Sequence, residues 1–393
     1  MKEAATVGDR VDDRKGADPA RDEVKPRRSL RADVEQVAAL DATTMLAWER
    51  LASRAVEPNP FFSPAFVVPA SRHLSSGSEV CIMFVRDGEE LIFAAPIVDT
   101  RRWRRLRFRV VRTWCHDQCF LGAPIVVDDD RAELAWRLVL DALARRRHRP
   151  HLLILELMPT GGRLEAALRR AAAGRRVESY ETYDRATLDG RSSDPKPVPR
   201  SGRRRRELER RSRRVEDTTG APFDTHDAAS SVDAVEGFLA LEGASWTGRA
   251  GTALISDPAT ADFARDLARA LRDRGELVLL TTTAGSGVAA QLFAIRDRDT
   301  LFMFKLAFDE RLARFSPGTQ LVHDLARWFA AEPTLVHIDS CAHPANEFIN
   351  RLLPDRRPLA TLLVSLDGGV GTVATALLPR LVALKRRIWR TAQ

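Results

Sequence analysis

The order of predicted helices and strands occurs twice along this chain of 393 residues, and this repetition limits the fold more than any single motif does. Each half begins with helical patterns and continues with three strand patterns joined by turn sequences such as Asp87-Gly88, which predicts antiparallel neighbours. A helix, a strand, a second helix and a final strand follow in both halves. We therefore expect an α/β chain with mixed α+β sheets, in which each of two lobes has a mostly antiparallel sheet flanked by helices.

These patterns divide the chain into five parts. Residues 1–31 are charged with little periodic apolar content, which is typical of a disordered tail. The two lobes are expected at 32–188 and 203–368, on either side of a linker at 189–202 that is rich in Gly, Ser and Pro, and 369–393 are expected to form a basic amphipathic helix. The strands are predicted at 80–85, 91–98, 108–114, 151–158 and 176–188, and then at 276–283, 288–296, 300–309, 334–339 and 359–366. The helices are predicted at 34–51, 131–147 and 162–173, and then at 203–215, 232–242, 261–274, 319–331 and 344–353.

The sequence disfavours several classes of protein. Met1–Arg31 lacks the apolar core of a secretory signal, and the longest apolar region, Leu359–Leu378, is interrupted by Asp367 and by glycines, so we expect no signal peptide and no transmembrane helix. We expect a cytoplasmic protein whose cysteines, Cys81, Cys115, Cys119 and Cys341, are reduced. His116 lies between two of them, but no second Cys or His pair follows nearby, so no metal site is expected.

The positive charge of the chain is concentrated in one segment. Lys196–Arg214 contains ten basic residues and only two acidic ones, an excess that equals the formal net charge of +8 of the whole chain. Such a run usually forms a solvated helical face. The alternative is a patch at Arg203–Arg214 for an anionic partner, which would be a cofactor phosphate, RNA or a polysaccharide.

An open loop precedes a helix within Phe302–Ala330. The strand, the loop and the helix N-terminus together resemble an anion site, because the first turn of a helix has free N–H groups and the positive end of the dipole. Glycine lets a ligand approach the backbone closely, and hydroxyl and guanidinium groups can donate to it. The candidate residues are Arg311, Arg314, Ser316, Gly318 and Thr319. The alternative is that Ser-Pro-Gly only starts a helix.

The corresponding position in the first half has a different charge. Asp128, Asp129 and Asp130 stand before its helix, and these residues cap a helix well but repel a phosphate. We therefore expect the first lobe to lack a cofactor loop and the second lobe to hold an anionic cofactor.

Three stretches carry a resemblance to a known family. They are "LEGASWTGRAGTAL" at Leu241–Leu254, "FKLAFDERLARFSPG" at Phe304–Gly318 and "HIDSCAHPANEFI" at His337–Ile349. Together with the order of elements, they resemble the GNAT acyltransferase superfamily, in particular its CelD-like branch, whose members have two GNAT-like lobes in tandem as FemAB transferases do. The resemblance covers about Trp48 to Leu366.

The resemblance implies an acyl-coenzyme A site in the second lobe. In this superfamily the coenzyme lies along the fourth strand and its pyrophosphate lies on the following loop, which assigns Leu306 and the five loop residues named above to the cofactor. One departure is that the loop has a single glycine, and Pro317 removes one N–H donor from it.

Four residues are candidates for catalysis. Acyl transfer to an amine needs a base for the ammonium proton and a group that polarises the thioester carbonyl. Strand alternation places Lys305 and Asp309 on one face, Asp339 lies at the C-terminal end of the next strand, where open sheets place ligands, and Glu242 precedes a loop. The alternatives are that Lys305 is an edge lysine or pairs with an acid, that Asp339 caps a helix and that Glu242 pairs with an arginine.

Trp246 and Arg249 are candidates for binding the acceptor, because their loop is suited to stacking and to close backbone approach. Alternatively, Trp246 is a core residue.

We predict an N-acyltransferase that uses acetyl-coenzyme A or another acyl-coenzyme A and modifies an amine of a small molecule, a sugar nucleotide or an exopolysaccharide precursor. The alternatives are a FemAB-type transferase that uses aminoacyl-tRNA and a non-catalytic scaffold in polysaccharide assembly. The helix at 370–390 either docks on the protein or contacts an anionic membrane peripherally.

Overall fold

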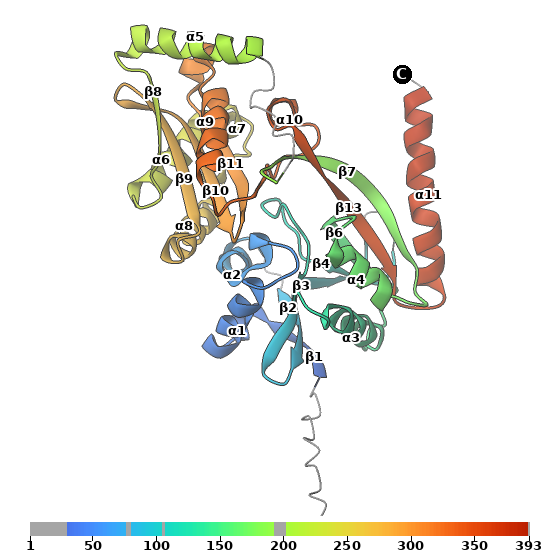
Figure 1. Ribbon diagram of the computed structural model, residues 1–393. Helices are drawn as coiled ribbons and strands as arrows, with labels where there is room; N and C mark the ends of the chain where they lie inside the picture. The colour runs from blue at the N-terminus through green and yellow to red at the C-terminus, as the bar shows by residue number, and fades with distance from the viewer. Residues whose placement is uncertain (1–29, 76–79, 104–106, 192–201, 392–393) are drawn as a thin grey trace, which may run out of the picture.

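The computed structural model describes residues 30–75, 80–103, 107–191 and 202–391 (Figure 1). Most of the predicted tail and linker therefore lies outside the described residues. The side chains of Arg204 and of residues 382–391 are also outside this description. Leu30 and Arg31, which the sequence assigned to the tail, begin the first strand.

The first half contains seven strands and four α-helices within its described residues. The strands are β1 (Leu30–Gln36), β2 (Cys81–Asp87), β3 (Glu90–Thr100), β4 (Val110–Thr113), β5 (Ile125–Val126), β6 (Leu152–Pro159) and β7 (Val177–Asp189). The helices are α1 (Ala42–Ala52), α2 (Pro64–His73), α3 (Ala132–Ala144) and α4 (Arg163–Ala171).

The prediction of a helix beginning at Val34 was wrong. That segment is the end of β1, which pairs antiparallel with β2, and Arg86 on β2 forms ion pairs with Asp33 (3.3 Å) and Glu35 (2.8 Å) on β1. These cross-strand contacts favour the extended form. The helix itself begins after Asp41, whose carboxylate accepts a hydrogen bond from the Thr44 N–H (2.7 Å).

The second half repeats this order of elements, as predicted. Its strands are β8 (Phe223–Asp227), β9 (Leu277–Ala284), β10 (Gly287–Asp297), β11 (Thr300–Phe308), β12 (His337–Asp339) and β13 (Asp355–Ser365). Its helices are α5 (Gly202–Thr219), α6 (Asp233–Ala244), α7 (Trp246–Arg249), α8 (Pro258–Asp273), α9 (Pro317–Ala331), α10 (Glu347–Leu352) and α11 (Val370–Thr391), and a 3-10 helix, η4, spans Glu310–Phe315. The sequence did not predict β8, and α7 lies in a segment that was predicted to be a loop.

All strands in the described ranges belong to one mixed sheet that runs through both lobes. Its order is β1-β2-β3-β4-β6-β13-β7-β12-β11-β10-β9-β8, with β5 paired to β3, so the two halves mirror each other about the centre. The last strands are exchanged, because β13 pairs with β6 of the first half while β7 pairs with β12 of the second. β7 and β13 lie side by side between the lobes (Figure 1). The lobes predicted from the sequence are therefore joined through a continuous sheet.

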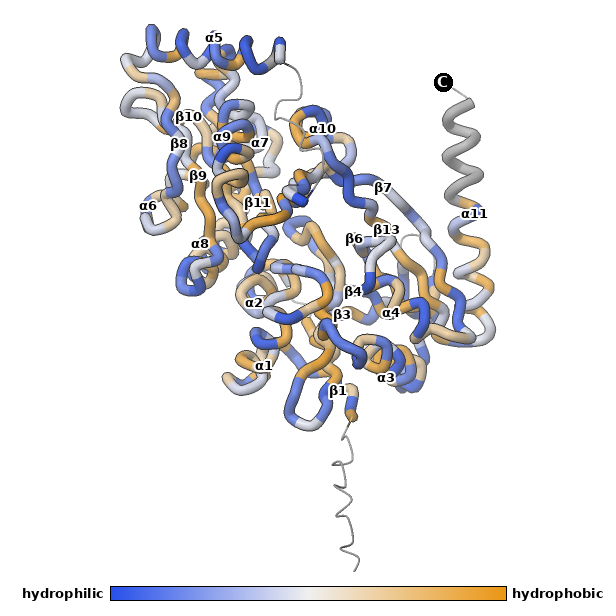
Figure 2. Tube along the Cα trace, in the orientation of Figure 1, coloured by the Kyte–Doolittle hydropathy of each residue, from blue (hydrophilic) through white to orange (hydrophobic). Residues whose placement is uncertain are grey.

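Aromatic side chains pack where the two lobes meet. The Phe61 ring contacts the Phe302 ring edge-on at a centroid distance of 5.8 Å, and the Phe66 ring contacts Phe263 at 5.3 Å. One hydrophobic cluster includes residues of both halves, and helices α2 and α8 contact each other beside it. Hydrophobic residues line much of the strands, while α5 is mostly hydrophilic (Figure 2). None of the helices in the described ranges combines the length and apolar content needed to cross a membrane.

Candidate active site

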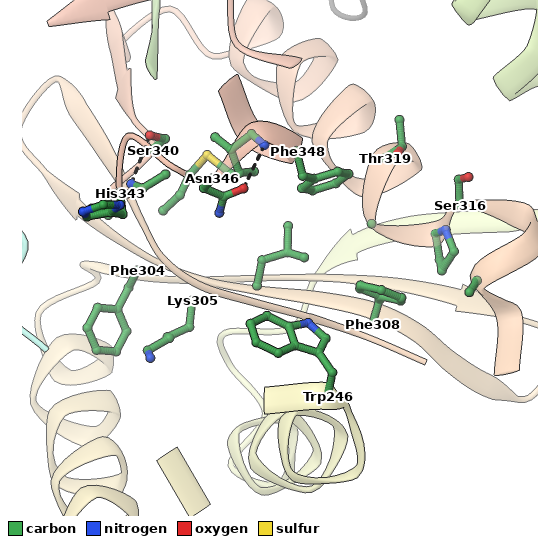
Figure 3. Close-up of a pocket in the computed structure, with 18 residues that line it drawn as sticks. Trp246, Phe304, Lys305, Phe308, Ser316, Thr319, Ser340, His343, Asn346 and Phe348 are labelled. Atoms are coloured by element: carbon green, nitrogen blue, oxygen red, sulfur yellow. Dashed lines mark hydrogen bonds between the residues drawn. The ribbon is translucent and has the colours of Figure 1, made fainter. Parts of the chain in front are cut away.

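A cavity of about 650 Å³ lies where β11 and β12 diverge (Figure 3). The two strands are parallel partners only from Thr300, which faces His337, to Phe302, which faces Asp339. β12 then ends, and Cys341 takes a positive φ of 54° as the chain turns away, while β11 continues to Phe308. The divergence leaves one edge of β11 facing the cavity. The lining residues are Trp246, Met303, Phe304, Lys305, Leu306, Phe308, Ala313, Ser316, Pro317, Gly318, Thr319, Ser340, Cys341, Ala342, His343, Asn346, Phe348 and Ile349.

The loop after β11 contributes one end of the cavity. Ser316 joins η4 to α9 in the left-handed conformation, with φ 61° and ψ 51°, and its carbonyl accepts hydrogen bonds from the N–H groups of Thr319 and Gln320 (both 3.0 Å). No described group accepts from the Gly318 N–H. A Cβ atom on Gly318 would lie 3.5 Å from Leu306 and from Phe308, so a larger side chain would enter the cavity. The N-terminus of α9 thus offers an N–H group and the positive helix end to a ligand.

The arginines that the sequence assigned to this loop lie outside the cavity lining. Arg311 is almost fully exposed and pairs with Asp309 (2.7 Å), and the guanidinium of Arg314 lies over the Phe315 ring at 4.6 Å. Instead, Arg211 of α5 donates a hydrogen bond to the Ser316 hydroxyl. A cation of the arginine-rich segment therefore contacts the loop.

Lys305 in the cavity lining interacts electrostatically with Glu242, which lies behind the lining. Lys305 lines the cavity; burial lowers the pKa of its ammonium group, and the carboxylates of Glu242 and Asp117 oppose this lowering. Glu242 is buried behind the lining and accepts a hydrogen bond from the Leu254 N–H (2.8 Å). Burial raises the pKa of Glu242, and the Leu254 N–H and the charge on Lys305 oppose this rise. Burial thus disfavours the charged form of both side chains, and their mutual attraction opposes this effect.

Comparison with known protein families gives a match for the half of the chain that contains this cavity. Residues 202–348 match the family model of the acetyltransferase (GNAT) domain. Residues 202–348 form a GNAT acetyltransferase domain. Because the first half has the same order of elements, the chain has two GNAT-like lobes in tandem, as predicted, and acyl transfer is the activity of this type of enzyme. The narrower assignment to the CelD-like branch stays a prediction.

Solved structures share the fold over most of the chain. A conserved protein of unknown function from Bacteroides thetaiotaomicron is 10% identical, with 82% of this chain and 97% of that chain covered at a TM-score of 0.51. FemX is 8% identical, with 81% of this chain and 95% of that chain covered at a TM-score of 0.52. At such low identity the likeness concerns the fold alone. A search of curated proteins finds no significant match.

Two other predicted catalytic residues of the GNAT domain lie outside the cavity lining. Asp309 follows the last residue of β11, accepts hydrogen bonds from the N–H and side chain of Arg311, and caps η4. Asp339 is fully buried between Arg185 (3.4 Å) and Arg357 (3.3 Å) and accepts a hydrogen bond from the Cys341 N–H (2.9 Å). These contacts hold the end of β12, and the catalytic role of Asp339 stays a prediction.

Trp246 and Arg249 lie together on α7 of the GNAT domain, but only Trp246 lines the cavity. Trp246 is 57% exposed, so the alternative of a core tryptophan was wrong. Glu310 fixes α7 in place, because its carboxylate accepts from the Trp246 N–H (2.7 Å) and pairs with Arg249 (2.8 Å). Arg249 therefore positions the tryptophan in the arrangement of Figure 3.

Sequence reasoning missed the wall opposite β11. Ser340, His343 and Asn346 come from the segment between β12 and α10, and Phe348 comes from the first turn of α10 (Figure 3). The His343 Nδ1 accepts a hydrogen bond from the Ala345 N–H (3.2 Å), which leaves the proton on Nε2. This segment belongs to the motif His337–Ile349 quoted above, and its polar residues are the sequence feature that could have predicted this wall of the cavity.

In the first GNAT-like lobe, the chain packs closely on part of the equivalent divergence, beside a cavity lined by Trp114, Cys115, His116 and Glu156. β4 and β6 are parallel partners, but the Gly122 N–H donates to the Leu157 carbonyl (3.3 Å), and a Cβ on Gly122 would lie 2.1 Å from the Glu156 carbonyl oxygen. Asp128 pairs with Arg163, and Asp129 pairs with Arg131 (2.6 Å). Acidic side chains paired with arginines therefore stand before α3, where the second lobe has the loop that precedes α9.

Proposed function

We propose that the protein is an N-acyltransferase that takes its acyl group from an acyl-coenzyme A and transfers it to an amine. The observation that supports this best is the cavity between β11 and β12, which extends from the N-terminus of α9 to Lys305. The diphosphate of the coenzyme would accept from the Gly318 N–H, and its pantetheine arm would lie along the free edge of β11 between Leu306 and Phe348.

Lys305 is suited to move the proton in this reaction. The acceptor nitrogen bonds to the thioester carbonyl carbon, the carbon–sulfur bond breaks, and the proton lost by the amine has to reach the thiolate. Burial lowers the pKa of Lys305, so a larger fraction of its side chain is neutral than in a free lysine, and this neutral amine would take up the proton and return it to the sulfur. The negative charge of Glu242, behind the cavity lining, raises the pKa of Lys305 because it favours the ammonium form.

Trp246 supports an acceptor with a flat or ring-shaped part. Its exposed ring stands at the side of the cavity, where it can stack on a sugar or a base. We therefore propose an amine on a small molecule, a sugar nucleotide or an envelope or exopolysaccharide precursor. A panel of amines from these classes, with release of free thiol as the readout, tests this choice. Turnover confined to amines without a ring would contradict it.

Coenzyme binding is tested by thermal shift with acetyl-coenzyme A and with desulfo-coenzyme A. A ligand at a hundredfold excess over its Kd stabilises the folded protein by about 2.7 kcal/mol. The variant G318L, which fills the space beside Leu306 and Phe308, is expected to lose this shift, while G318A is the matched control that keeps it. Coenzyme binding retained in G318L would contradict the proposed site.

A second candidate is transfer from aminoacyl-tRNA. It is favoured by the position of α5, whose Arg211 reaches Ser316 while Arg203, Arg205 and Arg213 are exposed on the same helix. Bulk tRNA in the same thermal-shift experiment distinguishes the candidates. Stabilisation by tRNA alone supports the second candidate, and the absence of any shift supports a scaffold without catalysis.

A further inference from the structure

Helix α11 has an apolar face that the described part of the protein leaves uncovered. The helix packs on β7 and β13 with Thr375, which is buried, and with Ala374 and Leu378, which contact the cluster around Trp103. On the outer side lie four exposed apolar residues at spacings of three and four, with exposed fractions between 49% and 59%. These residues, which we call the α11 stripe, are Val370, Val373, Leu377 and Leu381.

The sequence continues this pattern to the end of the helix. Leu384 and Ile388 follow Leu381 at the same spacing of three and four residues, which assigns them to the same helical face. From Val370 to Ile388 the helix is about 28 Å long, at a rise of roughly 1.5 Å per residue. The helix runs beside β7 and ends at the C-terminus, and hydrophobic residues mark its described turns (Figures 1 and 2). An apolar face of this length on the outside of a protein indicates a binding surface.

The charges of the helix indicate what covers this face. α11 contains five basic residues, Arg380, Lys385, Arg386, Arg387 and Arg390, and no acidic residue follows Asp367. At 100° per residue, Arg380 and Arg387 occupy positions on one side of the α11 stripe and Lys385 occupies a position on the other. An apolar face between basic flanks is the pattern of a helix that lies in the interface of an anionic membrane.

We propose that α11 docks the protein on an anionic lipid surface, with the α11 stripe in the boundary between headgroups and acyl chains. A second copy of the chain is a poorer occupant, because two such helices would bring ten basic residues together without an acidic partner from either helix. The proposal concerns a surface binding of the folded enzyme and is independent of the acyl-transfer chemistry.

Vesicle co-sedimentation of the full chain tests this proposal. We expect binding to vesicles of phosphatidylcholine with 30% phosphatidylglycerol, little binding to phosphatidylcholine alone, and release at roughly 1 M salt, where charges are screened within about 3 Å. The variant V373D/L377D is expected to lower the partition coefficient at least roughly tenfold. Both positions are exposed, so the variant is expected to fold. V232D, at an exposed valine of the second lobe, is the matched control that keeps wild-type binding.

A second variant, R380E, keeps the α11 stripe and reverses one flanking charge. It is expected to weaken binding to the anionic vesicles by roughly fivefold or more. No binding of the wild-type protein to anionic vesicles, or equal binding by V373D/L377D, would overturn the proposal. A wild-type dimer in light scattering that V373D/L377D converts to a monomer, without vesicle binding, would assign the stripe to a second copy and also overturn it.

Discussion

The buried carboxylate of Asp339 gives the sharpest test of how the two lobes are joined. Asp339 on β12 lies between Arg185 on β7 and Arg357 on β13, and both Asp339 and Arg185 are almost fully buried. Arg357 also pairs with Glu57 (2.8 Å), whereas the Arg185 Nε has no hydrogen-bond partner among the described atoms. Removing the charge of Asp339 therefore leaves Arg185 buried without its carboxylate.

We expect D339N to destabilise the fold by about 3–5 kcal/mol, the usual effect of breaking a buried ion pair. For a chain of this size this corresponds to a decrease in Tm of roughly 4–6 °C. Circular dichroism measures Tm, and turnover below the transition is measured in parallel. D309N is the matched control, because Asp309 pairs with an exposed arginine, and we expect little change in its Tm. A D339N protein with unchanged Tm and abolished turnover would refute the structural role and restore the catalytic one predicted from the sequence.

Three further predictions concern the site and the pH dependence of the protein. E242Q removes a charge that favours the ammonium form of Lys305, so the rising limb of kcat/KM against pH should move to lower pH, and an unmoved limb would contradict the coupling. W246A should raise the KM for the acceptor roughly tenfold without changing coenzyme affinity in calorimetry, and equal effects on both would contradict its assignment to the acceptor. Burial raises the pKa of Glu276 to about 7 and of Asp297 to about 6. The folded protein then binds more protons than the unfolded chain, so unfolding free energy should fall between about pH 4 and pH 7, less steeply in E276Q/D297N, and an equal slope would contradict this.

Local patterns predicted the elements that form the cavity. The alternation of β11, the turn sequences around it and the Ser-Pro-Gly start of α9 depend on neighbouring residues, so the sequence alone located this end of the site. The same alternation placed Asp309 with Lys305, but the strand ends at Phe308 and Asp309 caps the next turn instead. A pattern of period two does not show where a strand ends.

Contacts between distant segments were not predictable in this way. The exchange of β7 and β13 depends on pairing between strands that are far apart in the chain, and each strand would satisfy the same pattern in its own lobe. For the same reason the sequence did not show that Asp339 meets two arginines from other strands, or that Arg211 reaches Ser316. The arginine-rich segment Arg203–Arg214 and the polar segment His343–Asn346 can be recognised in the sequence, but only the fold shows that they lie beside the cavity.

Hydrogen exchange of backbone amides with and without desulfo-coenzyme A tests the central claim most directly. We predict slower exchange at Met303–Phe308 and at Gly318, where β11 and the N-terminus of α9 line the cavity, and no change at residues 114–131 of the first lobe. Protection of residues 114–131 with none at β11 or α9 would contradict the assignment of the coenzyme site to the second lobe.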